Sequence, residues 1–174
     1  QLGRYVVMGV TSSLVALPVF EPEMLPEERG DWLDLRAGHL DRIRQAFAGL
    51  QSGQRVILFC HDPTALPFLW RDDMIRSKLD QLSVTVIGHL HSKLLLWQSR
   101  LLAGMPAIRG FGNSIRRMSE ALSEARRWPS FRVRLCPALS GIQLLKDGGF
   151  FDLELDPDGR VPLEFRFHPL PWRK

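Results

Sequence analysis

The stretch RVILFCHDP (residues 55–63) joins an apolar run to a histidine, and the stretch VTVIGHLHS (residues 84–92) repeats this arrangement. The apolar runs, residues 55–59 and 84–87, are rich in β-branched side chains and have the length of buried strands. Each histidine therefore lies where a strand ends and a loop begins. Because ligands of open α/β sheets bind at the carboxyl ends of the strands, this pattern predicts a site at one edge of a sheet.

Three histidines follow these strands: His61, His89 and His91. Neutral imidazole is the commonest metal ligand in proteins, and a His-X-His sequence after a strand can direct two rings into one cleft. The alternative is a structural or surface histidine. For His39 and His168, which stand outside these motifs, we expect the structural role. The residues alone favour a metal site for the His89 and His91 pair, and for His61 alone they favour neither interpretation.

The order and spacing of these motifs resemble the calcineurin-like metallophosphoesterases. That family carries five motifs: Asp-X-His, Gly-Asp-X-X-Asp, Gly-Asn-His-Asp/Glu, a lone histidine after a strand, and Gly-His-X-His. This chain matches the fourth motif with His61-Asp62-Pro63 and the fifth with Gly88-His89-Leu90-His91, separated by a helix-sized gap. The resemblance covers the C-terminal half of the family, from about Arg4 to Phe167, and the first three motifs are missing.

The resemblance implies an α+β fold, as part of a layered α/β/β/α sandwich with a mixed β-sheet. It also implies that residues 1–174 form a single domain, the C-terminal portion of a calcineurin-like phosphoesterase domain. Because the first three motifs are missing, we expect this chain to act with a missing N-terminal half or with a second copy of itself.

The function implied by the resemblance is that of a metal-dependent phosphoesterase, a hydrolase of phosphate mono- or diesters. Such enzymes hold two divalent metal ions when intact, here Mn, Fe or Zn. The resemblance places His61 and His89 on the second metal and His91 on the first. The bridging Asp, the Asn ligand and the general-acid His belong to the missing motifs, so no catalytic or substrate-binding residue is assigned. We therefore expect this chain alone to be inactive toward its phosphate-ester substrate.

Two other functions fit the same sequence. The chain is alternatively a non-catalytic remnant that serves as a binding module, or a nucleic-acid-binding fragment of a nuclease. The nuclease fragment is suggested by the net charge of +4, because basic surfaces attract nucleic acid. This charge comes from 23 Lys and Arg against 19 Asp and Glu. The arginines are spread along the chain and form no aromatic-interleaved stripe, so nucleic acid is not the favoured partner.

Two short stretches imitate the missing motifs. Gly30-Asp31-Trp32-Leu33-Asp34 has the letters of the second motif, but it follows Pro26-Glu27-Glu28-Arg29, which is typical of a loop or a helix start. Gly112-Asn113-Ser114 resembles the third motif but lacks its histidine and comes after the fifth. We interpret Asn113 as the N-cap of a helix over residues 115–128.

The two cysteines, Cys60 and Cys136, each lie in an apolar run that predicts a strand. We expect both to be buried and reduced, which favours a cytoplasmic protein. Alternation along a strand points Cys60 and His61 to opposite faces, so Cys60 is not expected to bind metal. No apolar run in the sequence has the length needed to span a membrane.

The rest of the chain predicts further strands, amphipathic helices and turns. The expected strands are residues 5–10, 133–135, 141–146, 149–155 and 161–167, and the expected helices are residues 40–50, 72–82 and 115–128. Residues 14–28 contain three prolines and predict an irregular loop, whereas residues 93–102 fit either a helix or a strand. Asp156-Pro157-Asp158-Gly159 predicts a turn that closes a hairpin.

Overall fold

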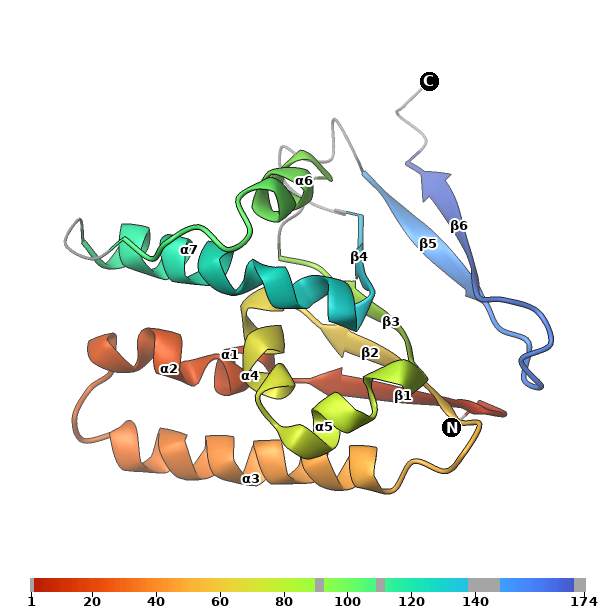
Figure 1. Ribbon diagram of the computed structural model, residues 1–174, viewed down its shortest axis with the longest axis horizontal. Helices are drawn as coiled ribbons and strands as arrows, with labels where there is room; N and C mark the ends of the chain where they lie inside the picture. The colour runs from red at the N-terminus through yellow and green to blue at the C-terminus, as the bar shows by residue number, and fades with distance from the viewer. Residues whose placement is uncertain (1, 90–92, 109–111, 138–147, 171–174) are drawn as a thin grey trace.

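The centre of the fold is a parallel sheet of four strands in the order β1-β2-β3-β4 (Figure 1). The computed structural model describes residues 2–89, 93–108, 112–137 and 148–170. The four strands are β1 (Tyr5–Val10), β2 (Arg55–Cys60), β3 (Leu82–Ile87) and β4 (Val133–Leu135). Because all of them run in the same direction, their carboxyl ends lie at one edge of the sheet. The residues that follow β2 and β3 are therefore brought close together.

The helices that build the core lie on one side of this sheet, and an antiparallel hairpin lies on the other side (Figure 1). The described α-helices are α1 (Ser12–Val15), α2 (Leu17–Phe20), α3 (Arg29–Ala48), α4 (Leu66–Trp70), α5 (Asp73–Ser77), α6 (Lys93–Leu101) and α7 (Asn113–Glu124). The described 3-10 helices are η1 (Glu21–Glu23), η2 (Pro63–Ala65), η3 (Leu79–Gln81) and η4 (Ala125–Phe131). The hairpin strands are β5 (Gly149–Glu154) and β6 (Glu164–Pro169).

Strand β2 separates two hydrophobic clusters, because side chains alternate between the faces of a sheet. Val56, Leu58 and Cys60 belong to the cluster that packs against the helices, and each is almost fully buried. Ile57 belongs to the opposite cluster, which the hairpin covers with side chains such as Phe165. The helix-covered cluster is the larger one, so most of the apolar burial that stabilises the fold lies on that side.

The hairpin covers only the amino-terminal part of its face of the sheet. Tyr5 in β1 and Ile57 in β2 are buried beneath it, whereas Val7 and Phe59, each two residues further along, are both 46% exposed. The burial patterns of the strands follow the same change. The carboxyl half of this face is therefore open within the described part of the chain.

The sequence predicted the strands of the main sheet correctly, and the mixture of helix and strand is consistent with an α+β fold. The sheet is not mixed, however, because the described strands form a parallel sheet and a separate antiparallel pair. The connections between successive strands contain helices, which allow β2, β3 and β4 to run parallel to β1. A short turn can join only antiparallel strands. The layered sandwich stays a prediction, and the strand expected at residues 141–146 lies outside the described residues.

Several helical regions differ from the prediction. The helix expected over residues 72–82 is divided into α5 and η3, and β3 already begins at Leu82. Residues 14–28, expected as a loop, contain half of α1 together with α2 and η1. Pro18 and Pro22 lie in the first turns of α2 and η1, where the missing N–H would have no helical partner. Helix α3 begins at Arg29 rather than at residue 40 and continues through Gly38. Residues 93–101, left open between helix and strand, form helix α6.

The hairpin turn follows its sequence signature. Gly159 has a positive φ of 66°, and its N–H donates to the carbonyl of Asp156 at 2.8 Å. The Asp156 carboxylate accepts from the N–H groups of Asp158, Arg160 and Val161. These bonds hold the turn that joins β5 to β6, although β6 begins at Glu164, later than the residue expected.

Candidate functional site

The carboxyl ends of β2 and β3 meet at a single carbonyl group. The backbone oxygen of His61 accepts hydrogen bonds from the N–H groups of Gly88 at 3.0 Å and of His89 at 2.8 Å. These bonds extend the pairing of β2 with β3 beyond the last strand residues. The two histidine motifs of the sequence are thereby held next to each other.

The rings of His61 and His89 lie edge to face at this point. Their centroids are 5.6 Å apart and their planes make an angle of 83°. Gly88 leaves the space that the His61 ring occupies, since a Cβ at this position would lie 2.7 Å from His61 Nδ1. That distance is too short for a side chain, so any larger residue has to displace the ring. The glycine of the Gly-His-X-His motif therefore has a steric role here.

The two imidazoles have the chemistry of metal ligands, and the separation of their ring centroids is compatible with two ligands of one ion. A zinc–nitrogen distance of about 2.0–2.1 Å places the centroids of two rings on a tetrahedral ion roughly 5 Å apart. The observed separation of 5.6 Å is close to that value, and both side chains are exposed. His91, the third expected ligand, lies outside the described residues. Within the described residues, no three or more His, Cys, Asp or Glu side chains form a group that could hold a metal.

Asp62 is the carboxylate nearest to His61 in the sequence, and it has a structural task. Its Oδ1 accepts a hydrogen bond from the N–H of Thr64 at 2.9 Å, which caps the start of η2. Its backbone carbonyl accepts from the thiol of Cys60 at 3.3 Å. Asp62 thus fixes the loop that carries His61 through one of its two carboxylate oxygens.

The cysteines differ from each other in their surroundings. Cys60 is buried among the core residues, and this burial, with a smaller contribution from Asp62, raises the pKa of its thiol to about 12. A protonated thiol on the helix-covered face is a poor metal ligand. Cys136 was expected to be buried, but it is exposed, because β4 ends at Leu135.

The other two described histidines have structural partners. His39 Nε2 accepts a hydrogen bond from the N–H of Thr11 at 3.0 Å, and burial together with the charge of Arg42 lowers the pKa of the ring. His168 stacks on Phe150 with centroids 4.9 Å apart, and its Nε2 lies 2.6 Å from the Asp152 carboxylate. Both contacts are compatible with the structural role expected for these two residues.

The stretches that imitate the missing motifs both lie on helices. Asp31 and Asp34 belong to α3 and line a shallow hollow beside Gly38 and Arg42. Asn113 is the first residue of α7, and Gly112, with φ 86°, is the N-cap, one residue earlier than predicted. Neither stretch takes the place in the sheet that the second or third motif requires.

An apolar hollow of about 440 Å³ opens next to His89. Its walls come from α2, η2, the α6 region, α7 and η4, and its lining includes Phe20, Leu102, Met118, Leu122 and Trp128. The sequence analysis did not identify this hollow. Its only local signal is the amphipathic spacing of Met118 and Leu122 on α7, because the other walls are distant in sequence.

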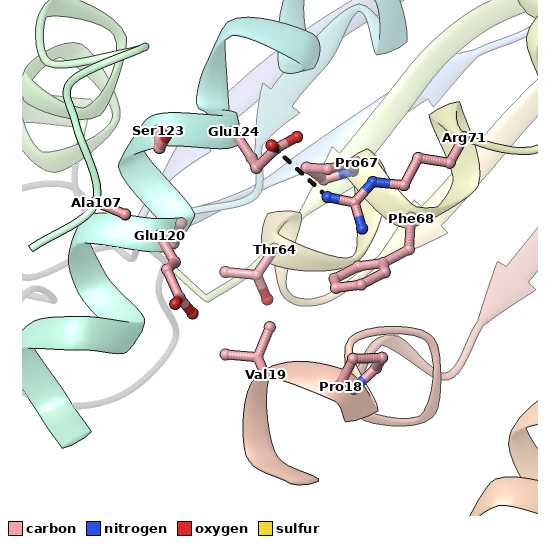
Figure 2. A pocket seen from close by; sticks show the side chains of 11 residues that line it. Pro18, Val19, Thr64, Pro67, Phe68, Arg71, Ala107, Glu120, Ser123 and Glu124 are labelled. Atoms are coloured by element: carbon pink, nitrogen blue, oxygen red, sulfur yellow. Dashed lines mark ion pairs between the residues drawn. The ribbon is translucent and has the colours of Figure 1, made fainter. Parts of the chain in front are cut away.

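A second hollow of about 370 Å³ adjoins the first (Figure 2). Val19, Thr64 and Ala121 line both hollows and so form their common wall. The second hollow is more polar, with Arg71 paired to Glu124 at 3.6 Å across it. The two spaces together lead from His89 along α7 to this ion pair.

Several arginines are held against aromatic rings or acidic side chains. Arg127 lies 3.7 Å from the centroid of Trp70, and Arg134 lies 4.0 Å from that of Phe165. Arg117 lies over Phe20 and pairs with Glu23 at 3.3 Å. Such contacts give these cations a role in packing, and they do not favour the nucleic-acid alternative.

The chain gives no significant match to protein-family models, to curated proteins or to solved structures. The family resemblance therefore rests on the two histidine motifs of the sequence alone. Of the helices in the described ranges, none combines the length and the apolar character that crossing a bilayer requires.

Proposed function

We propose that this chain belongs to a metal-dependent phosphoesterase and supplies histidine ligands of its dinuclear centre. The observation that carries the proposal is the pairing of the His61 and His89 rings, 5.6 Å apart, at the carboxyl edge of a parallel sheet. Two imidazoles in this arrangement suit a first-row divalent metal such as Mn, Fe or Zn. The order of the two motifs in the sequence supports the same proposal.

Each residue of the proposed site has a separate task. His61 and His89 hold one ion, and His91, which lies outside the described residues, is proposed as a ligand of the other. Gly88 leaves the space for the His61 ring, and the Asp62 cap fixes the loop that carries it. The bound ions supply charge that stabilises the phosphoryl group during hydrolysis.

The proposal requires ligands from outside the described residues. Two divalent ions need carboxylates as well as neutral imidazoles to balance their charge, and no group of three or more His, Cys, Asp or Glu side chains that could hold a metal forms within the described residues. We therefore propose that an additional protein segment, either an N-terminal half or a second copy of the chain, completes the centre. The half-exposed Val7 and Phe59 support this, because such a segment would cover them.

The proposal is tested by phosphatase activity of the protein expressed from its complete reading frame. With Mn²⁺ and p-nitrophenyl phosphate, we expect His89→Ala and His91→Ala to lower the rate by at least about 100-fold, since even second-shell changes cost 10–100-fold. His39→Ala is the control and should leave the rate nearly unchanged. Metal-dependent turnover that survives both substitutions would rule the assignment out. A folded protein with no turnover under any of the three metals would favour the binding-module alternative.

A further inference from the structure

The hollow beside His89 has a mostly apolar lining with a few polar side chains. Its apolar lining comes from Phe20, Pro63, Leu102, Met118, Leu122 and Trp128. The polar side chains are those of Asp62, Thr64, His89, Gln98, Ser99 and Arg117. A cavity of about 440 Å³ lies within the range of small-molecule sites, which are mostly apolar with a few oriented polar groups.

The polar side chains of the lining carry charges of both signs. Arg117 contributes a guanidinium, which pairs with Glu23 at 3.3 Å and lies over the ring of Phe20, and Asp62 contributes a carboxylate. His89 contributes one of the two imidazoles of the proposed metal centre. A metal ion held by His89 would supply the positive charge that a phosphate ester requires, while the rest of the ligand would extend along apolar side chains.

The second hollow adjoins the first at Thr64 and Ala121 and is lined by the ion pair of Arg71 with Glu124, where Arg71 also lies 4.8 Å from the ring centroid of Phe68. Because the second hollow is the more polar of the two, the apolar part of a ligand at His89 is expected to lie in the first hollow.

We propose that this hollow binds the apolar part of the substrate, so that the substrate class is the phosphate esters of alkyl or aryl alcohols. The proposal rests on the proposed function, because it places the phosphate of the ester at the His89 site. An alkyl or aryl group suits this lining because apolar side chains predominate in it, whereas the hydroxyl groups of a sugar or nucleoside would need hydrogen bonds from the few polar side chains, such as Gln98 and Ser99.

The test uses phosphonates, which bind without being hydrolysed. Octylphosphonate and methylphosphonate are titrated into the 174-residue chain with Zn²⁺ by calorimetry. We expect the octyl compound to bind at least about tenfold more tightly, since each buried methylene adds to the affinity. Leu102→Asp should abolish this preference. Leu101→Asp is the matched control, because Leu101 is 68% exposed, Leu102 is 46% exposed, and only Leu102 lines the hollow.

A second variant and a spectroscopic signal make the outcome independent of one substitution. Ala121→Phe fills the common wall of the two hollows and should reduce octylphosphonate binding as Leu102→Asp does. In the unmodified chain, octylphosphonate should shift the indole N–H resonance of Trp128 and methylphosphonate should not. Equal affinity for both phosphonates, or an octyl preference that persists in Leu102→Asp and Ala121→Phe, would overturn the proposal.

His89→Ala separates this inference from the proposed function. If both proposals hold, this substitution weakens both phosphonates equally and keeps the octyl preference. If His89→Ala changes neither affinity while Leu102→Asp abolishes the preference, the apolar hollow is supported and the phosphate site at His89 is refuted.

Discussion

The two faces of the parallel sheet differ in how completely they are covered. Leu58 and Phe59 are neighbours in β2, yet Leu58 is fully buried beneath the helices and Phe59 is 46% exposed on the hairpin side. The hairpin protects Ile57 but does not reach the carboxyl half of the strands. One face of the sheet therefore forms the core, and the other opens toward the edge where the histidines lie.

This difference separates the residues that stabilise the fold from those that form the site. The helix-covered face ends at Cys60, which is buried and holds the Asp62 loop through its thiol. The next residue, His61, is exposed and contacts His89. Stability and the proposed metal site are thus assigned to adjacent residues of one chain segment, and paired substitutions can test the assignment.

The largest effect is expected from substitutions in the middle of β2. Leu58→Ala should lower the free energy of unfolding by about 2–5 kcal/mol, because it creates a cavity in the helix-covered core. Phe59→Ala, one residue away, should cost less than about 1 kcal/mol, since half of its side chain is in water. Urea unfolding of both variants measures the contrast. Similar losses for the two would show that the hairpin face is as closed as the helical face.

A smaller effect on stability, and a specific one on metal binding, is expected at Gly88. Gly88→Ala should cost about 1 kcal/mol, because its Cβ meets the His61 ring and forces it to move. The displaced ring should also reduce the affinity for Zn²⁺ by about tenfold or more. Gly9 in β1 is the matched control, since a Cβ there meets no atom within 4 Å. Equal Zn²⁺ affinities in Gly88→Ala and Gly9→Ala would show that Gly88 is not needed to position the His61 ring for metal binding.

The smallest effect concerns His39, the histidine with a backbone partner. Its pKa is lowered in the folded protein, by burial and by Arg42, so the unfolded chain binds the proton more readily. The neutral His39 ring therefore favours the folded state above the pKa of histidine in the unfolded chain, about 6.5. This stability is lost as the pH falls through about 6.5 toward the lower pKa of His39 in the folded protein. His39→Gln should remove less than about 1 kcal/mol of the pH dependence between pH 7.5 and 5.5. Unfolding curves that keep the same pH dependence would show that His39 does not titrate differently on folding.

The main strands could be predicted because their signal is local. The apolar runs before His61 and before Gly88 can be identified as strands without knowing which strands they pair with. The residue types at positions 156–159 likewise predict a turn by themselves. The helices before residue 40 were missed because Pro18 and Gly38 usually interrupt helices. Pro18 lies in the first turn of α2 and Gly38 lies within the 20-residue helix α3, so neither does so here.

The site was predictable only in part. The sequence identified His61 and His89 and predicted that they lie close together, since parallel strands bring their carboxyl ends to one edge of a sheet. It did not show that Gly88 accommodates the His61 ring or that Asp62 serves as a cap. The apolar hollow was not predictable, because Phe20, Leu102 and Trp128 reach it from segments far apart in the chain.

The most direct test of the central claim is calorimetric titration of the 174-residue chain with Zn²⁺. The account predicts saturable binding that is lost in His61→Ala and in His89→Ala and retained in His39→Ala, because only the first two rings lie together at the carboxyl edge of the sheet. Zn²⁺ binding of the same affinity in all three variants would contradict the claim that these two histidines form a metal site.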